Sequence, residues 1–246
     1  MPDRSLLSET RALSEYWQLV ADPVYRGRGV PQGNNDLVIV LPGLFGNDTY
    51  LSPLRDWLRR IGHQPALSTI PLNVGCPSRL QERVLRNLER RIANTTGPIA
   101  IIGHSRGGLL GKALATRIGD QCTRLIALGS PLGIALRAGE DRLLDLMQPE
   151  NADLAARPVA NAGRMAMKLF SPDCRFPACG CSYVQDLLGP LGSSTQVTAI
   201  YSKEDPVVAP EASIIDGAEN ISVTGSHGGL VTNRMVYRAL AQALVA

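Results

Sequence analysis

The chain has 246 residues, of which 44% are apolar and 19% are charged, and its formal net charge is +3. This composition is too apolar for a disordered protein, and the length suits a single α/β domain over residues 1–246. The positive charge is spread along the chain, without the basic stripe of a nucleic-acid binder or a polybasic membrane cluster. We therefore expect no nucleic-acid partner.

The N-terminal segment MPDRSLLSETRALSEYW does not resemble a secretory leader. It carries charged and polar residues throughout and has no apolar core followed by a small-residue cleavage site. Apolar runs elsewhere are shorter than a membrane-spanning helix requires. The five cysteines are an odd number, which favours free thiols in a reducing compartment. We expect a cytoplasmic protein without an integral membrane segment.

Apolar runs alternate with helical patterns along most of the chain. Continuous apolar runs predict strands that are covered on both faces, and apolar residues three and four positions apart predict amphipathic helices. This alternation predicts an α/β fold with a mostly parallel sheet and helices on both faces. In the first part of the chain we expect a helix at 5–20, a strand in LVIVLPGLFGN, a helix at 50–61 and a strand in PALSTIPL. A helix should follow a capping box formed by Ser78 and Gln81, and then a strand at 99–102 and a helix from Leu109. The last expected elements are strands in TRLIALGSP, TQVTAIYSKED and NISVTGSHGG and a helix at 233–245.

The segment GPIAIIGHSRGGLLGKALATRI joins a strand to a helix through a short turn centred on Ser105. Gly103, Ser105 and Gly107 match the pattern G-x-S-x-G, which is weak alone but stronger between a strand and a helix. Small residues relieve the crowding of such a reversal and leave the serine hydroxyl exposed near a helix N-terminus. The turn therefore predicts a nucleophile at Ser105.

A serine nucleophile needs a base, and the chain has three histidines. His104 adjoins Ser105 on the turn, so its side chain should point elsewhere, and His63 is expected to be a surface or packing residue. His227 lies in the glycine-rich loop VTGSHGGLVTN, between the last strand and the last helix. Such a loop can reach over the sheet toward Ser105, so we expect His227 to be the base rather than a structural histidine.

The group that orients the histidine should lie between Ser105 and His227 in the chain. Asp205 follows a strand and precedes Pro206, so it should sit in a loop at the same sheet edge, where the alternative is an ordinary Asp-Pro turn. Glu204 is its nearest competitor. Asp216 and Glu219 are more distant candidates.

Two backbone N–H groups are expected to stabilise the oxyanion of a tetrahedral intermediate. One follows the nucleophile and belongs to Arg106, and the other belongs to Leu44 in the loop after the first strand. The alternative for the second loop is a turn that only leaves the strand.

In combination and order, VIVLPGLFGN, GHSRGG, YSKEDPVV and GSHGG resemble the α/β-hydrolase superfamily, and more closely its compact bacterial lipases and esterases. The resemblance implies a Ser105, Asp205 and His227 triad with Leu44 and Arg106 supplying the oxyanion hole. It also implies a small-molecule ester or lipid substrate and no cofactor. Where lipases have His-Gly in the oxyanion loop, this chain has Pro-Gly, which affects loop geometry and substrate preference.

These features predict a serine hydrolase that cleaves carboxylic esters through an acyl-enzyme. An acyltransferase or thioesterase on the same fold remains an alternative. A non-catalytic binding protein that kept the fold is the alternative from a different class.

Residues 131–192 interrupt the alternation and are too long for a plain loop, which predicts a small cap inserted in the domain. Helical patterns at 138–147 and 160–170 carry apolar faces. We expect these faces to contact the sheet and the acyl group of a substrate, with Met165 and Phe170 among the substrate-binding residues.

The insertion also contains Cys174, Cys179 and Cys181. Their spacing lacks a C-x-x-C pair and an evident fourth ligand, so we expect no metal site. Free thiols are favoured, and a disulfide within the insertion is the alternative.

Overall fold

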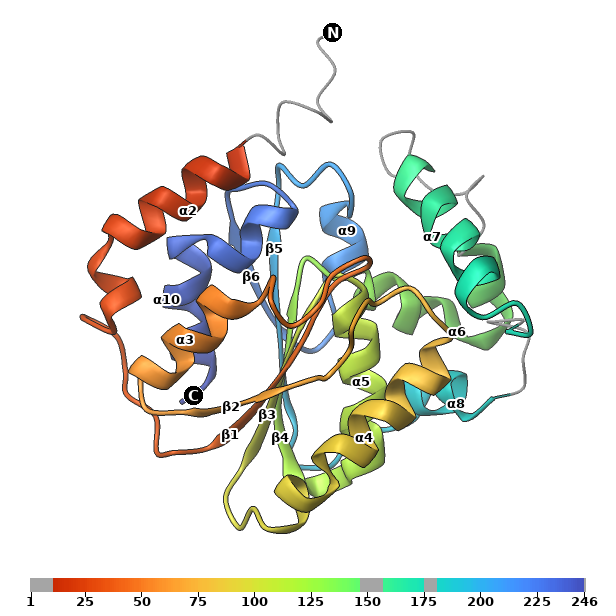
Figure 1. The fold of residues 1–246 in the computed structure, drawn as a ribbon, viewed down its shortest axis with the longest axis horizontal. Helices are drawn as coiled ribbons and strands as arrows, with labels where there is room; N and C mark the ends of the chain where they lie inside the picture. Colours follow the sequence, from red (N-terminus) through yellow and green to blue (C-terminus); the bar gives the residue numbers. More distant parts are fainter. Residues whose placement is uncertain (1–10, 147–156, 175–180, 246) are drawn as a thin grey trace, which may run out of the picture.

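The computed structural model describes residues 11–146, 157–174 and 181–245, without the side chains of 140–146. Six strands form one sheet in the order β2-β1-β3-β4-β5-β6, and every neighbouring pair is parallel. The predicted α/β fold with a parallel sheet is thereby confirmed (Figure 1). The strands are β1 (Leu37–Leu41), β2 (Gln64–Leu67), β3 (Ile99–His104), β4 (Cys122–Leu128), β5 (Gln196–Ser202) and β6 (Glu219–Val223).

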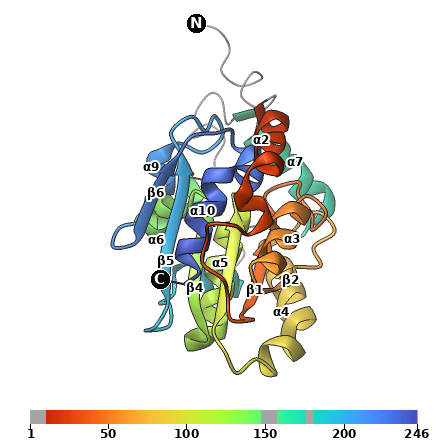
Figure 2. The same ribbon diagram turned by 90° about the vertical axis from the view of Figure 1, so that its left-hand side faces the viewer.

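Helices cover both faces of the sheet, as Figures 1 and 2 show. One face carries α2 (Arg11–Ala21), α3 (Ser52–Arg60) and α10 (Arg234–Ala243), and the other carries α4 (Pro77–Ala93), α5 (Arg106–Ile118) and α8 (Ser182–Leu188). The remaining helices are α6 (Leu132–Leu146), α7 (Arg157–Phe170) and α9 (Pro210–Ser213), with short 3-10 turns η1 (Pro23–Arg26), η2 (Gly119–Gln121) and η4 (Gly228–Thr232).

The core is divided in two by the sheet because side chains alternate along each strand. In β1, Ile39 packs among the residues of α4 and α5, whereas Val38 and Val40 pack against α3 and α10. On this second face Trp57 and Tyr237 are fully buried, with ring centroids 4.7 Å apart. Burial on both faces explains why the strand sequences are continuously apolar.

The capping box predicted at Ser78 and Gln81 is wrong. Helix α4 begins at Pro77, and Cys76 precedes it without a side-chain cap. Proline fixes the backbone angle that a first helical residue needs and has no N–H to satisfy. The Gln81 side chain is buried instead, where it donates to Asp186 Oδ2 at 2.8 Å.

The segment between β4 and β5 contains α6, α7 and α8, which places helices in both regions where the sequence predicted them. Lys112 of α5 holds the end of this segment, because its buried ammonium donates to the carbonyl of Gly189, the residue after α8, at 2.6 Å. The same ammonium donates to Thr116 Oγ1 within α5 at 2.8 Å. Burial lowers the pKa of Lys112 to about 8. Met147, at the end of the expected helix 138–147, lies outside the described residues.

All strands of a parallel sheet point the same way, so the loops after β1, β3, β5 and β6 emerge at one edge. Ligand sites of α/β folds lie at this carboxyl edge. Within the part of the chain that the structure describes, no helix is long and apolar enough to cross a membrane.

Candidate active site

Ser105 stands at a tight turn between β3 and α5, with φ 54° and ψ −124°. Few residues other than glycine adopt this backbone conformation, and such strain is characteristic of functional turns. A Cβ on Gly103 would overlap the carbonyl of Gly107, and one on Gly107 would overlap the carbonyl of Leu41. The glycines of G-x-S-x-G are therefore needed for the close approach of β3, α5 and the end of β1.

Ser105, His227 and Asp205 form a continuous hydrogen-bonded series. His227 Nε2 lies 3.0 Å from Ser105 Oγ, and His227 Nδ1 lies 2.7 Å from Asp205 Oδ2. Since a carboxylate only accepts, Nδ1–H donates to Asp205 and leaves Nε2 as the acceptor for the serine hydroxyl. The structure thus brings together the three residues predicted from separate loops.

Asp205 is held in one orientation by its own loop. Its Oδ1 accepts from the backbone N–H groups of Val207 at 2.8 Å and Val208 at 2.9 Å, which leaves Oδ2 for His227. The Asp205 side chain is only 1% exposed. Such a carboxylate can hold the imidazole in one tautomer and orientation.

The competing carboxylates are engaged elsewhere. Glu204 pairs with Arg11 at 2.9 Å on the surface. Asp216 lies 4.0 Å from Arg137, and Glu219 accepts from the Thr198 hydroxyl at 3.2 Å. Geometry therefore favours Asp205 among the four candidates.

Leu44 and Arg106 border the same cavity as Ser105. Arg106 is the first residue of α5, so its N–H has no carbonyl one turn earlier to bind within the helix. A Cβ on Gly43 would lie 3.1 Å from Ser105 Cβ, which shows how closely the loop after β1 approaches the serine. The two residues predicted to supply the oxyanion donors thus border the same cavity as Ser105.

The Arg106 side chain holds a neighbouring loop. Its guanidinium donates to the carbonyls of Asn73 at 3.1 Å and Gly75 at 2.7 Å, and burial lowers its pKa. Asn73 in turn donates from Nδ2 to the Pro42 carbonyl at 2.7 Å. The loop that carries Leu44 is therefore fixed to the start of α5.

His104 is buried beside Ser105 and His227, and its contacts could not be predicted from the sequence. Its Nε2 lies 3.0 Å from the His227 carbonyl oxygen, so Nε2–H is the donor. The two imidazole centroids are 4.9 Å apart. Burial, with a smaller contribution from His227, lowers the pKa of His104 to about 3. His104 is thus a neutral hydrogen-bond donor that supports the His227 loop.

The titration of His104 predicts a pH dependence of stability. Its pKa is about 3 in the folded chain and 6.5 in an unfolded one, so the unfolded chain binds more protons between these values. From pH 6.5 to pH 4, the free energy of unfolding should fall by about 3 kcal/mol for this group. Denaturant unfolding of the native protein and His104→Gln at several pH values would measure it. If the free energy of unfolding changed equally with pH in the two proteins, the lowered pKa of His104 would be contradicted.

Of the two roles expected for His63, surface residue or packing residue, the structure shows the second. It is 5% exposed, and its ring lies against Gly33. Burial lowers its pKa. It takes no part in the site at the sheet edge.

A cavity of about 790 Å³ opens above Ser105. The loop after β1 forms one wall, and helix α7 forms another with Val159, Ala160, Gly163, Arg164 and Met167. A Cβ on Gly163 would lie 2.9 Å from Leu44 Cδ2, so α7 packs directly against the loop after β1. The lining is mainly apolar.

Met165 and Phe170, expected to bind substrate, do not line this cavity. They are 75% and 57% exposed, and Phe170 is the last residue of α7. The cavity-lining residues recur about every four positions, so Gly163 and Met167 share a face from which Met165 is turned away. The sequence predicts the apolar residues of α7 but not which of them line the cavity.

Tyr50 is a further residue of the site that the sequence analysis missed. Its hydroxyl donates to the Gly228 carbonyl at 2.9 Å, and its ring packs near His104. No local pattern marks a tyrosine for this role, because its partner is far away in the chain.

In the described part of the chain, no cluster of three or more His, Cys, Asp or Glu side chains could hold a metal ion. Cys76 and Cys122 are buried free thiols. Cys179 lies outside the described residues, so the state of the insertion's cysteines stays a prediction.

No model of a known protein family matches the chain, and no curated protein matches it. Solved structures do. Est1E from Butyrivibrio proteoclasticus is 20% identical, with 88% of this chain and 93% of that one covered and a TM-score of 0.55. A monoacylglycerol lipase from Paleococcus ferrophilus is 14% identical, with 88% and 96% covered and a TM-score of 0.55.

An alpha/beta superfamily hydrolase from Oenococcus oeni PSU-1 is 12% identical, with 87% of this chain and 94% of that one covered and a TM-score of 0.57. Similarity at this level of identity concerns the arrangement of helices and strands. The chain therefore has the α/β-hydrolase fold.

Proposed function

We propose that this protein is a serine hydrolase that cleaves carboxylic esters through an acyl-enzyme. The observation that carries the proposal is the hydrogen-bonded series from Ser105 through His227 to Asp205, which lies at the base of a mainly apolar cavity. Hydrolase names among proteins of the same fold support the reaction class.

In the first half-reaction, Ser105 Oγ attacks the ester carbonyl carbon while His227 Nε2 takes the hydroxyl proton. Asp205 stabilises the imidazolium that forms and keeps its proton on Nδ1. The oxyanion accepts hydrogen bonds from the N–H groups of Leu44 and Arg106. As the tetrahedral intermediate collapses, His227 returns the proton to the leaving alcohol and the acyl group stays on Ser105.

In the second half-reaction, water replaces the alcohol. His227 takes a proton from water, the hydroxide attacks the acyl carbon, and His227 then protonates Ser105 as the acid leaves. The chain's own side chains supply every proton transfer in this scheme.

The mainly apolar lining of the cavity supports a substrate with an apolar acyl group. We propose that residues 131–192 act as a cap whose helix α7 covers this group, since α7 contributes a wall of the cavity above Ser105. Each buried methylene adds about 0.8 kcal/mol, so acyl groups longer than acetyl should be preferred.

Initial rates on p-nitrophenyl esters from acetyl to octanoyl test the proposal, with the matching thioesters and an added alcohol acceptor run in parallel. We expect ester hydrolysis with kcat/KM that rises with chain length. Turnover of thioesters alone, or transfer to the alcohol in preference to water, would favour the thioesterase or acyltransferase. No turnover of any substrate would favour a binding protein.

The face of α7 that meets the cavity predicts which methionine affects specificity. Met167→Ala should lower kcat/KM for the octanoyl ester about tenfold relative to the acetyl ester, because it removes about 1.4 kcal/mol of apolar contact with a long chain. Met165→Ala, on the exposed side of the same helix, is the matched control and should leave the ratio unchanged. Equal effects of the two substitutions would contradict this role of α7.

A further inference from the structure

A carboxylate from the N-terminal helix α2 holds the His227 loop at Ser226, the residue that precedes the histidine. Ser226 donates its backbone N–H to Glu15 Oε1 at 2.9 Å and its hydroxyl to Oε2 at 2.7 Å. Ser226 is 1% exposed. Because each carboxylate oxygen receives a separate donor, the contact fixes both the place and the rotation of the residue next to His227.

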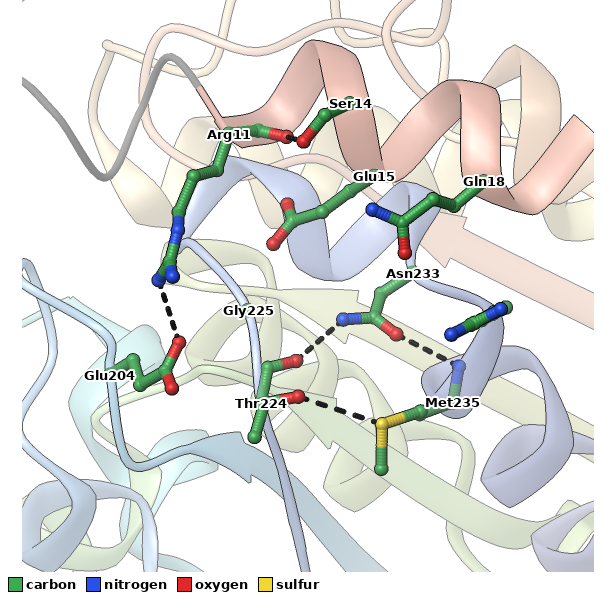
Figure 3. A pocket seen from close by; sticks show the side chains of 10 residues that line it. Arg11, Ser14, Glu15, Gln18, Glu204, Thr224, Gly225, Asn233 and Met235 are labelled. Carbon is green, nitrogen blue, oxygen red and sulfur yellow. Dashed lines mark hydrogen bonds and ion pairs between the residues drawn. The ribbon is translucent and has the colours of Figure 1, made fainter.

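The glycines around His227 are explained by this contact. A Cβ on Gly229 would overlap Glu15 Oε2, and a Cβ on Gly225 would lie 2.9 Å from Oε1. The segment GSHGG therefore leaves room for the Glu15 carboxylate to reach the loop backbone. Figure 3 shows Glu15 extending from α2 toward the segment that contains Gly225.

A second connection joins the Asp205 loop to the His227 loop. The Ser202 hydroxyl donates to the Gly225 carbonyl at 2.6 Å and accepts from the Glu204 N–H at 3.0 Å. Arg11, one turn before Glu15 on α2, pairs with Glu204 (Figure 3). That ion pair is 58% and 45% exposed, and exposed pairs contribute about 0–1 kcal/mol. The half-buried Glu15 contact is the stronger connection.

We infer that Glu15 is a positioning residue for His227. Acting through Ser226, its carboxylate keeps the imidazole within hydrogen-bonding reach of Ser105, although it touches neither the imidazole nor the substrate cavity. The inference rests on the proposed hydrolase function. Glu15 borders a separate cavity of about 260 Å³ (Figure 3).

Loss of this contact should affect the chemical steps more than substrate binding. A catalytic group displaced by about 1 Å can cost about 10²-fold in rate. We therefore expect Glu15→Ala to lower kcat by about 10- to 100-fold with little change in KM. Glu15→Gln should retain most activity, because its amide oxygen can accept from the Ser226 N–H and its amide nitrogen can donate to a reversed Ser226 hydroxyl.

The test measures kcat and KM on p-nitrophenyl butyrate for the native protein, Glu15→Ala, Glu15→Gln and the control Gln18→Ala. Gln18 is exposed on the same helix and borders the same small cavity. Rates are divided by the number of sites that a fluorophosphonate labels at completion. The expected order is the native protein and Gln18→Ala together, then Glu15→Gln, then Glu15→Ala.

Glu15→Ala with native kcat per labelled site would overturn the inference, even if its melting temperature fell, because that outcome describes a purely structural residue. A native protein that the fluorophosphonate does not label would instead refute the proposed function. The two failures are therefore distinguishable.

Ser226→Ala provides an independent variant if Glu15→Ala does not fold. It removes the hydroxyl bond to Glu15 and the bond that this hydroxyl accepts from the Gly229 N–H at 3.2 Å, but it keeps the Ser226 N–H bond to Glu15. It should therefore lower kcat in the same direction and to a smaller extent. Ser226→Ala with native kcat per labelled site would overturn the inference.

Discussion

Ser105→Ala should abolish ester hydrolysis and leave the fold intact. The loss should be about 10⁶-fold, as when a serine nucleophile is removed from a triad. No other group can replace it, because within the described residues Ser105 Oγ is the only hydroxyl that is hydrogen-bonded to His227 Nε2. The turn itself should persist, since the Ser105 N–H bond to the Leu128 carbonyl at 2.8 Å does not involve the side chain.

The measurement is kcat/KM on a p-nitrophenyl ester, with thermal unfolding as the check on the fold. Ser130→Ala is a suitable control because Ser130 is also buried near α5 but does not border the cavity. It should keep native activity. More than a few per cent of native activity in Ser105→Ala would exclude Ser105 as the nucleophile.

Asp205→Asn should lower kcat by about 10⁴-fold. The two N–H donors from Val207 and Val208 will hold the new amide oxygen where Oδ1 now lies, which turns the NH₂ group toward His227 Nδ1. An imidazole that accepts at Nδ1 must carry its proton on Nε2. It then cannot take the proton of Ser105.

Glu204→Gln is the matched substitution at the neighbouring position. The Glu204 carboxylate pairs with Arg11 at the surface, whereas His227 is bonded to Asp205. The substitution should therefore lower kcat by a few-fold at most. Rates of the two variants on the same ester decide between them. A larger loss from Glu204→Gln would assign the orienting role to that residue.

The sequence predicts the fold and the grouping of Ser105, Asp205 and His227 well, because both depend on local patterns. Continuous apolar runs identified the strands, and the glycines around Ser105 marked a turn that only small residues permit. The expected order of serine, carboxylate and histidine along the chain then indicates the loops that carry Asp205 and His227. A parallel sheet brings such loops to one edge whatever their separation in sequence.

Features that depend on long-range packing could not be predicted in the same way. The apolar residues of α7 were recognised, yet the face presented to the cavity is set by the contact of Gly163 with Leu44, more than a hundred residues away. The same holds for His104 and Glu15, whose partners lie in the His227 loop. Side chains that act through distant backbone groups leave no local signal.

Reaction with a fluorophosphonate, followed by intact-mass measurement, decides whether Ser105 is an activated nucleophile. The native protein should gain the mass of one adduct, peptide mapping should place it on Ser105, and Ser105→Ala should gain none. Asp205→Asn should react far more slowly than the native protein. A native protein that gains no adduct, or an adduct that persists in Ser105→Ala, would show that Ser105 is not an activated nucleophile.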